Sequence, residues 1–137
     1  MPAPLAKTNV EKIIAVITNF VRGGDHRDTG LLDQVFHPDF QVASHGFLGT
    51  AGVTLLSRHQ YLANVEAGIF GGVPRLMTIE HVDVSGGLAM VKLRLESAEN
   101  HFLSYNSLVA DAEGNWQLLY NVAVVVPRND PPAPGRP

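Results

Sequence analysis

Hydrophobic side chains recur three or four positions apart near the start of the chain, in residues 8–22. This spacing predicts an amphipathic helix, because residues so spaced lie on one helical face. Thr8 and Glu11 form a capping box at its start, and Gly23 with Gly24 is typical of a helix end. The apolar positions are Val10, Ile13, Ile14, Ile17, Phe20 and Val21.

Two shorter helices are predicted further along the chain. Residues 29–36 carry apolar side chains on one helical side, and residues 57–68 do the same. Ser57 and Gln60 form a second capping box at the start of the latter helix. Between the two helices, residues 47–56 contain several glycines, which predicts a loop or an irregular strand.

The segment FHPDF, residues 36–40, lies between the second helix and the first predicted strand, residues 40–44. A proline disfavours helical geometry at the residue before it, so the chain must leave the helix at His37. We expect a structural role for His37, Pro38 and Asp39, because turns commonly use such residues. The two phenylalanines would anchor the corner in the core.

The rest of the chain predicts four strands, at 75–84, 88–97, 101–110 and 116–126, joined by short glycine-containing turns. Residues 88–97 alternate cleanly between apolar and polar side chains, and this alternation favours a solvent-facing Arg94. The order helix, helix, strand, helix and four strands indicates an α+β fold, with helices packed on one face of a mixed or antiparallel sheet.

The last predicted strand is unusual because residues 122–126, VAVVV, are apolar on both faces. A strand of this kind is normally covered on both sides. The helices would cover one face, and a symmetric second subunit is the economical cover for the other. The proline-rich tail, residues 127–137, predicts no regular structure.

Composition excludes several classes of function. The chain has 137 residues, which suits one domain, and its formal net charge is −3 with scattered basic residues, which argues against nucleic acid as a partner. It has no cysteine, so thiol chemistry, disulfides and cysteine-ligated metals are excluded. We expect a cytoplasmic location, because neither a signal peptide nor an apolar run of the ~20 residues needed for a membrane span is visible.

Three features together resemble the nuclear transport factor 2-like superfamily, NTF2-like for short: GGD after the first helix, FHPDF before the first strand, and FLSYNSLVADAEGNWQLLYNVAV near the end. The resemblance covers about residues 8–126 and is strongest to the lumazine-binding and SnoaL-like branch. It implies a cone in which three N-terminal helices pack on a curved, mostly antiparallel sheet. It also implies an apolar pocket and homodimers through the outer sheet face. Members include isomerases, dehydratases, cyclases and proteins without chemistry.

The resemblance also locates candidate site residues. Three catalytic positions of the steroid isomerase branch fall on Ser44, Ile17 and Asn106, of which the first two cannot replace the branch's carboxylate base and tyrosine. In the lumazine-binding and SnoaL-like branch, the positions matching Ser104 and Asn121 tend to carry an acid and a base, and here both are neutral. These substitutions favour ligand binding, in a pocket with a few neutral polar groups, over acid–base catalysis.

His45 is the one candidate acid or base, because it ends the first strand near the expected pocket mouth and histidine titrates near neutrality. Tyr61 is the aromatic residue most expected in the pocket, since its helix closes the mouth in this fold. The six histidines show no metal-ligand spacing, so neither a metal nor a cofactor is expected. The expected ligand-binding set is Ser44, His45, Tyr61, Ser104, Asn106 and Asn121.

Three hypotheses remain open from the sequence. The first is a small-molecule-binding protein whose ligand is apolar or aromatic, and it is favoured by the neutral residues at the catalytic positions. The second is an isomerase, dehydratase or cyclase that acts on a compact hydrophobic substrate and uses His45. The third is a partner-binding dimer whose pocket is filled by core side chains such as Phe20, Tyr61 and Phe102.

Overall fold

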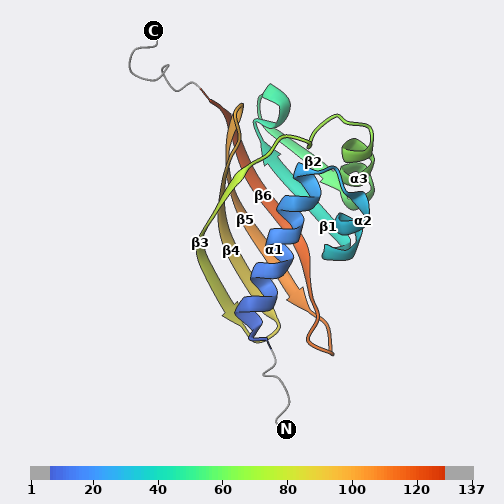
Figure 1. The fold of residues 1–137 in the computed structure, drawn as a ribbon, viewed down its shortest axis with the longest axis vertical. Coiled ribbons are helices and arrows are strands. Elements are labelled where there is room, and N and C mark those ends of the chain that lie inside the picture. Colours follow the sequence, from blue (N-terminus) through green and yellow to red (C-terminus); the bar gives the residue numbers. More distant parts are fainter. Residues whose placement is uncertain (1–6, 129–137) are drawn as a thin grey trace.

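The structure, a computed structural model that describes residues 7–128, has three α-helices and a 3-10 turn on one side of a six-stranded sheet (Figure 1). The α+β architecture predicted from the sequence is confirmed. Most of the predicted tail, residues 129–137, lies outside the described residues. The elements are α1 (Asn9–Asp25), α2 (Thr29–Val35), β1 (Phe36–His45), η1 (Phe47–Gly49), β2 (Val53–Ser57), α3 (Arg58–Glu66), β3 (Leu76–Ser85), β4 (Leu88–Glu96), β5 (Asn100–Ala110) and β6 (Trp116–Pro127).

The strands follow the order β2-β1-β6-β5-β4-β3, and all neighbours are antiparallel except β1 and β6. The sheet curves around α1, which lies across its concave face, and α2 and α3 lie beside β1 and β2 (Figure 1). The buried core fills the space between α1 and the sheet, with Ile13 and Ile17 facing Leu93, Leu108 and other buried strand residues. Both predicted capping boxes, at the starts of α1 and α3, are present.

The prediction that Gly23 and Gly24 end the first helix is wrong, because α1 continues through both to Asp25. The two glycines allow close packing instead. A Cβ at Gly23 would lie 2.7 Å from Leu32 Cδ2, and one at Gly24 would lie 2.8 Å from Arg75 Nη2. Tertiary packing against α2 and the start of β3 therefore explains why glycine occupies these helical positions.

Helix α1 ends in the hydrogen-bond pattern of a Schellman motif, in which Arg27 occupies the left-handed position that glycine usually takes. The φ angle of Arg27 is 51°, its amide donates to Gly24 O at 3.3 Å, and the next amide, of Asp28, donates to Gly23 O at 2.8 Å. The Arg27 guanidinium also donates to Gly71 O at 3.0 Å. This side chain thus connects the end of α1 to the loop between α3 and β3.

The FHPDF segment is the first half of β1 and not only a corner before it, since the strand begins at Phe36. Its pairing with β6 is irregular between Phe36 and Gln41, so the corner forms inside the strand. The expected anchoring by phenylalanine is confirmed: the rings of Phe36 and Phe40 are both buried and stack with centroids 3.8 Å apart. His37 Nδ1 accepts a hydrogen bond from the Asp39 amide at 3.0 Å, which is a structural use of that histidine.

The two faces of the sheet differ as the alternation in β4 predicts. Arg94 faces solvent on the outer, convex face, where its Nε donates to Glu80 Oε1 at 2.8 Å. In β6, Leu119 is an extra residue between the pairs Tyr120–Ser107 and Leu118–Leu108. This β-bulge shifts the side-chain alternation by one position. As a result, Leu118 and Asn121 both point to the concave face.

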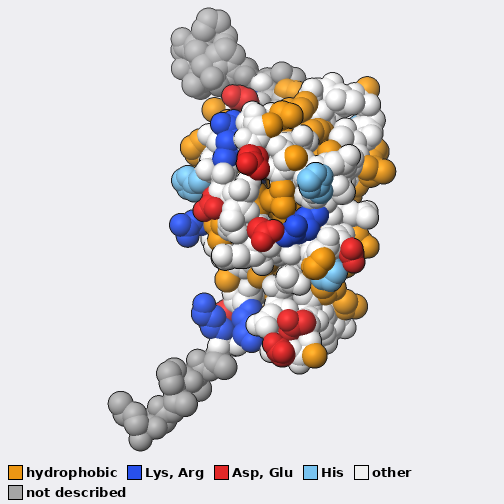
Figure 2. Space-filling model, turned by 90° about the vertical axis from the view of Figure 1, so that its right-hand side faces the viewer, with side chains coloured by type: hydrophobic (Ala, Val, Ile, Leu, Met, Phe, Trp, Pro, Cys, Tyr) orange, Lys and Arg blue, Asp and Glu red, His pale blue; other side chains and the backbone are white. Residues whose placement is uncertain are grey.

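The side of the molecule that carries α2 and α3 shows acidic and basic side chains interspersed, with hydrophobic side chains between them (Figure 2). No block of one charge stands out in this view. Within residues 7–128, no helix combines the length and the apolar character needed to cross a membrane.

Candidate functional site

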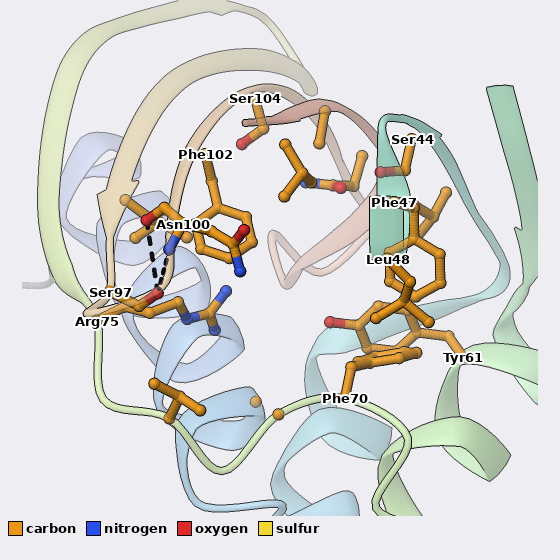
Figure 3. Close-up of a pocket in the computed structure, with 18 of the residues that line it drawn as sticks. Ser44, Phe47, Leu48, Tyr61, Phe70, Arg75, Ser97, Asn100, Phe102 and Ser104 are labelled. Carbon is orange, nitrogen blue, oxygen red and sulfur yellow. Dashed lines mark hydrogen bonds between the residues drawn. The ribbon is translucent and has the colours of Figure 1, made fainter. Parts of the chain in front are cut away.

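A cavity of about 510 Å³ lies between the helices and one end of the concave sheet face (Figure 3). Its wall is built by α1, α3, η1, the loop from α3 to β3, the turn from β4 to β5, and side chains from every strand except β3. Most of its surface is apolar or aromatic, and a few polar groups interrupt it. The residues that supply those polar groups are Ser44, Tyr61, Arg75, Asn100, Ser104 and Asn121, with Arg27, Ser97 and Glu99 nearer the rim.

Four of the six residues expected in a ligand site line this cavity: Ser44, Tyr61, Ser104 and Asn121. Three of them come from strands whose alternation turns them to the concave face, where each is almost fully buried from bulk solvent. The cavity therefore brings together residues from β1, β5 and β6 that lie far apart in the sequence.

Asn106 does not line the cavity but lies directly behind its wall, fully buried. Its Nδ2 donates to Ser104 Oγ at 3.0 Å and to Val91 O at 3.3 Å, and its Oδ1 accepts from Asn121 Nδ2 at 2.6 Å. All hydrogen-bonding capacity of the Asn106 amide protons is thereby used. Its role is to hold Asn121 and Ser104, whose remaining polar atoms face the cavity.

His45 lies outside the cavity, contrary to what its position at the end of β1 led us to expect. It follows Ser44 directly, and successive strand residues point to opposite faces. Its partners in the neighbouring strands, Val53 and Val124, are exposed residues of the outer face, and His45 is exposed as well. The placement gives no support to an acid–base role for His45 inside this cavity.

One side of the cavity is aromatic. Tyr61 on α3 lies 4.8 Å from Phe70 between ring centroids, and Phe70 lies 5.2 Å from Phe47 in an edge-to-face arrangement. Burial raises the pKa of the Tyr61 phenol, an effect that nearby Arg75 partly opposes and that Asp25 adds to. Its hydroxyl therefore stays protonated at neutral pH and points toward the cavity (Figure 3), where it can donate a hydrogen bond.

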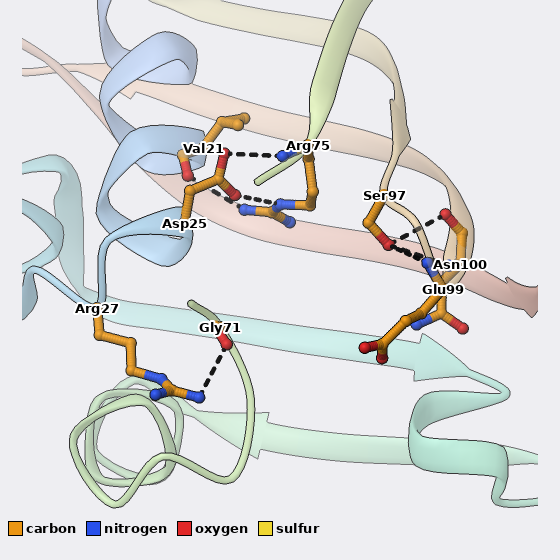
Figure 4. A network of polar contacts seen from close by, with 8 residues as sticks. All are labelled: Val21, Asp25, Arg27, Gly71, Arg75, Ser97, Glu99 and Asn100. Atoms are coloured by element: carbon orange, nitrogen blue, oxygen red, sulfur yellow. Dashed lines mark hydrogen bonds and ion pairs between the residues drawn. The ribbon is translucent and has the colours of Figure 1, made fainter. Parts of the chain in front are cut away.

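Arg75 is a cavity residue that the sequence did not indicate. Its Nε lies 2.6 Å from Asp25 Oδ1, its amide donates to Asp25 Oδ2 at 3.2 Å, and its Nη2 donates to Val21 O at 3.2 Å (Figure 4). The two charged side chains are only 14% and 13% exposed, so solvent screens their attraction less than it would at the surface. They stand 50 positions apart in sequence, and no local spacing pattern connects them.

The turn between β4 and β5 forms the rim opposite the aromatic side. Ser97 Oγ accepts hydrogen bonds from the amides of Glu99 at 3.1 Å and Asn100 at 3.0 Å, which fixes the turn (Figure 4). The side-chain amide of Asn100 forms no hydrogen bond with another described residue and lies beside Arg75 at the cavity (Figure 3). This turn therefore presents an unused polar group to a ligand.

The remaining candidate position, Ile17, does not line the cavity. Ile17, which matches the tyrosine of the steroid isomerase branch, is buried in the core as expected. Among residues 7–128, no three histidine, aspartate or glutamate side chains are grouped closely enough to hold a metal ion. What the site offers is a preformed cavity with several hydrogen-bonding groups.

Solved structures show the same fold. An NTF2-like protein from Shewanella baltica has a TM-score of 0.74 at 16% identity, covering 90% of this chain and 100% of its own. One from Silicibacter pomeroyi has a TM-score of 0.73 at 20% identity, covering 85% and 95%. One from Cytophaga hutchinsonii has a TM-score of 0.75 at 12% identity, covering 88% and 100%.

These likenesses place the chain in the NTF2-like class of folds. Within that class, residues 8–122 match the family described as "Putative lumazine-binding", and the chain belongs to that family. The resemblance to the NTF2-like superfamily and its lumazine-binding branch, inferred from the sequence, is thus confirmed. A comparison with curated proteins found no match.

Proposed function

We propose that this protein binds a small molecule in the cavity between its helices and the concave sheet face. The observation that carries the proposal is the cavity itself, which is about 510 Å³ in volume and has polar groups converging on it from several elements. Ligand sites typically have this size and this combination of apolar walls with a few placed polar groups. Phe20, Tyr61 and Phe102 line the cavity without filling it, which speaks against a vestigial pocket.

The family description names lumazine, a flat bicyclic heteroaromatic compound, and lumazine is therefore one reasonable test ligand. The proposal itself requires only that a compact, largely apolar or aromatic molecule be bound. The alternative of catalysis by His45 is not favoured, because its side chain lies on the outer face of the sheet.

The test is native mass spectrometry of the gently purified protein, followed by titration with lumazine and with naphthalene, a neutral fluorescent probe. Ala123 lines the cavity, so Ala123→Phe should fill it and abolish binding of either compound. Ala63→Phe, on the exposed side of α3, is the matched control and should leave binding unchanged. Equal binding by both variants would contradict the proposal.

We further propose that the protein is a homodimer through the outer sheet face. That face carries exposed apolar side chains along β6, including Val122 and Val124, whereas its β3–β4 side carries the Arg94–Glu80 ion pair. An apolar surface of this kind normally marks an interface. The other exposed large apolar residues on this face are Val53, Leu55, Leu76, Leu88, Met90, Tyr105, Tyr120 and Val126.

Light scattering coupled to size-exclusion chromatography tests this interface. The unmodified protein should be a dimer, Val122→Glu should be a monomer, and Thr78→Glu near the charged edge of the same face should remain a dimer. A monomeric unmodified protein at micromolar concentration would rule the interface out.

A further inference from the structure

Two polar groups on one side of the cavity have unused hydrogen-bonding capacity. Arg75 uses Nε and one proton of Nη2 within the protein, and no described residue accepts a hydrogen bond from its Nη1. The Asn100 side-chain amide is likewise without a described partner. Both groups point toward the same part of the cavity, across from the hydroxyl of Tyr61 (Figure 3).

The Arg75 guanidinium is held in place before any ligand arrives. Asp25 fixes its Nε edge and Val21 O accepts from Nη2 (Figure 4). The Phe102 ring centroid also lies 5.5 Å from its Cζ. A donor fixed in this way loses little conformational freedom on binding. Its Nη1 protons can therefore recognise an oxygen acceptor with a defined direction.

The charge on this side of the cavity is close to balanced. Asp25 offsets Arg75 through their hydrogen-bonded ion pair, and Asp25 itself does not line the cavity. The other charged lining residues are Arg27 and Glu99, one of each sign, and both are exposed to solvent. A full anion would lose its hydration in the cavity and would also be repelled by Asp25, so a neutral acceptor suits the site better.

The opposite side of the cavity favours ligands with a flat ring. Tyr61, Phe70 and Phe47 stand in ring-to-ring contact there, and their edges and faces form a surface suited to a flat ring. A ligand that reaches both sides needs an aromatic body and a polar edge.

We propose that the ligand class is a flat aromatic compound with a neutral carbonyl oxygen at one edge, which accepts hydrogen bonds from Arg75 Nη1 and the Asn100 amide. This inference rests on the proposed function and specifies it. It narrows the sequence-based expectation of a small apolar or aromatic ligand to an aromatic ligand with one hydrogen-bond acceptor.

The test compares three probes of one shape, titrated by calorimetry: 2-naphthamide, 2-naphthoate and 2-methylnaphthalene. With the unmodified protein, the amide should bind at least about 10-fold more tightly than the methyl compound, because the hydrogen bond to the charged Arg75 alone contributes about that ratio. It should also bind more tightly than the anionic naphthoate. With Asp25→Asn, Arg75 keeps its charge without a counterion, so the order of naphthoate and naphthamide should reverse.

Asn100→Leu provides a second variant that leaves the Asn100 backbone hydrogen bonds available. It should reduce affinity for the amide several-fold and leave the methyl compound unchanged, whereas Glu113→Gln, in the exposed turn between β5 and β6 away from the cavity, should change neither. If the three probes bind equally, the acceptor requirement is wrong while small-molecule binding stands. If none of the three probes binds to the unmodified protein or to Ala123→Phe, both proposals fail.

Discussion

The amide nitrogen Nδ2 of Asn121 lies 2.6 Å from Oδ1 of Asn106, across the antiparallel pair of β6 and β5. The two residues are direct cross-strand partners, yet only Asn121 reaches the cavity. Asn106 in turn donates hydrogen bonds to Ser104 Oγ and to the Val91 carbonyl of β4. The polar face of the cavity is therefore supported by one buried amide.

Replacement of this amide should be costly. Asn106→Leu leaves Asn121 Nδ2 and Val91 O without their partner in a buried environment, and such loss costs about 1–3 kcal/mol in the free energy of unfolding. Urea unfolding measures the effect, and Ser107→Ala on the outer face of the same strand serves as control. A loss no larger than that of the control would show that the amide network does not stabilise the fold.

Gly23 should not tolerate alanine despite its helical position. Alanine favours a helix interior over glycine by about 1 kcal/mol. At Gly23, however, the added Cβ would lie 2.7 Å from Leu32, which is fully buried and cannot move aside easily, and overpacking of this kind costs about 1–3 kcal/mol.

Gly30→Ala is the matched comparison for Gly23→Ala, because the nearest atom to a Cβ at Gly30 in α2 is 3.5 Å away. We expect Gly30→Ala to raise the midpoint of thermal unfolding slightly and Gly23→Ala to lower it. A stabilised Gly23→Ala protein would show that Leu32 can repack.

Two substitutions at Arg27 separate its backbone conformation from its side-chain contacts. Both Arg27→Gly and Arg27→Ala lose the hydrogen bonds to Gly68 O and Gly71 O. Only glycine also relieves the left-handed backbone at this position, which costs other residues about 1–2 kcal/mol. Arg27→Gly should therefore be the more stable of the two by about 1 kcal/mol in urea unfolding, and the reverse order would exclude this account.

The raised pKa of Tyr61 predicts a loss of stability at alkaline pH. In the unfolded chain the phenol ionises near pH 10, whereas burial delays its ionisation in the folded chain. The contribution of Tyr61 is complete below that pH, and it falls as pH rises toward the folded pKa. Above about pH 10, the unmodified protein should therefore lose stability relative to Tyr61→Phe. Unfolding at several pH values, with absorbance at 295 nm to follow phenolate, measures this; a pH-independent difference would contradict it.

Much of the fold follows from local patterns in the sequence. The capping residues Thr8 and Ser57 correctly indicated two helix starts, because a cap depends only on neighbours three positions away. Alternation likewise oriented Ser104 and Arg94, since the period of a strand is fixed at two. The same rule turns His45 to the outer face once Ser44 faces the cavity. The expectation that His45 belongs to the pocket therefore conflicts with the alternation of its own strand.

What the sequence could not supply are relationships between distant segments. Asp25 and Arg75 meet only because the end of α1 packs against the start of β3, and no spacing rule connects them. Gly23 resembles a helix terminator until Leu32 is known to press against it. In both cases tertiary packing outweighs the local tendency, and the site's main cationic donor was missed for that reason.

The parallel pairing of β1 with β6 also bears on when the cavity comes into existence. Ser44 pairs with Ala123, near the opposite end of the chain, and both line the cavity. Such distant pairings carry a high entropic cost of loop closure and slow folding. We therefore expect the β3–β6 hairpins to assemble earlier and β1 to join later. The cavity wall is complete only after β1 has joined the sheet, so a ligand would bind only the native chain. Binding would therefore delay the separation of β1 from β6 during unfolding.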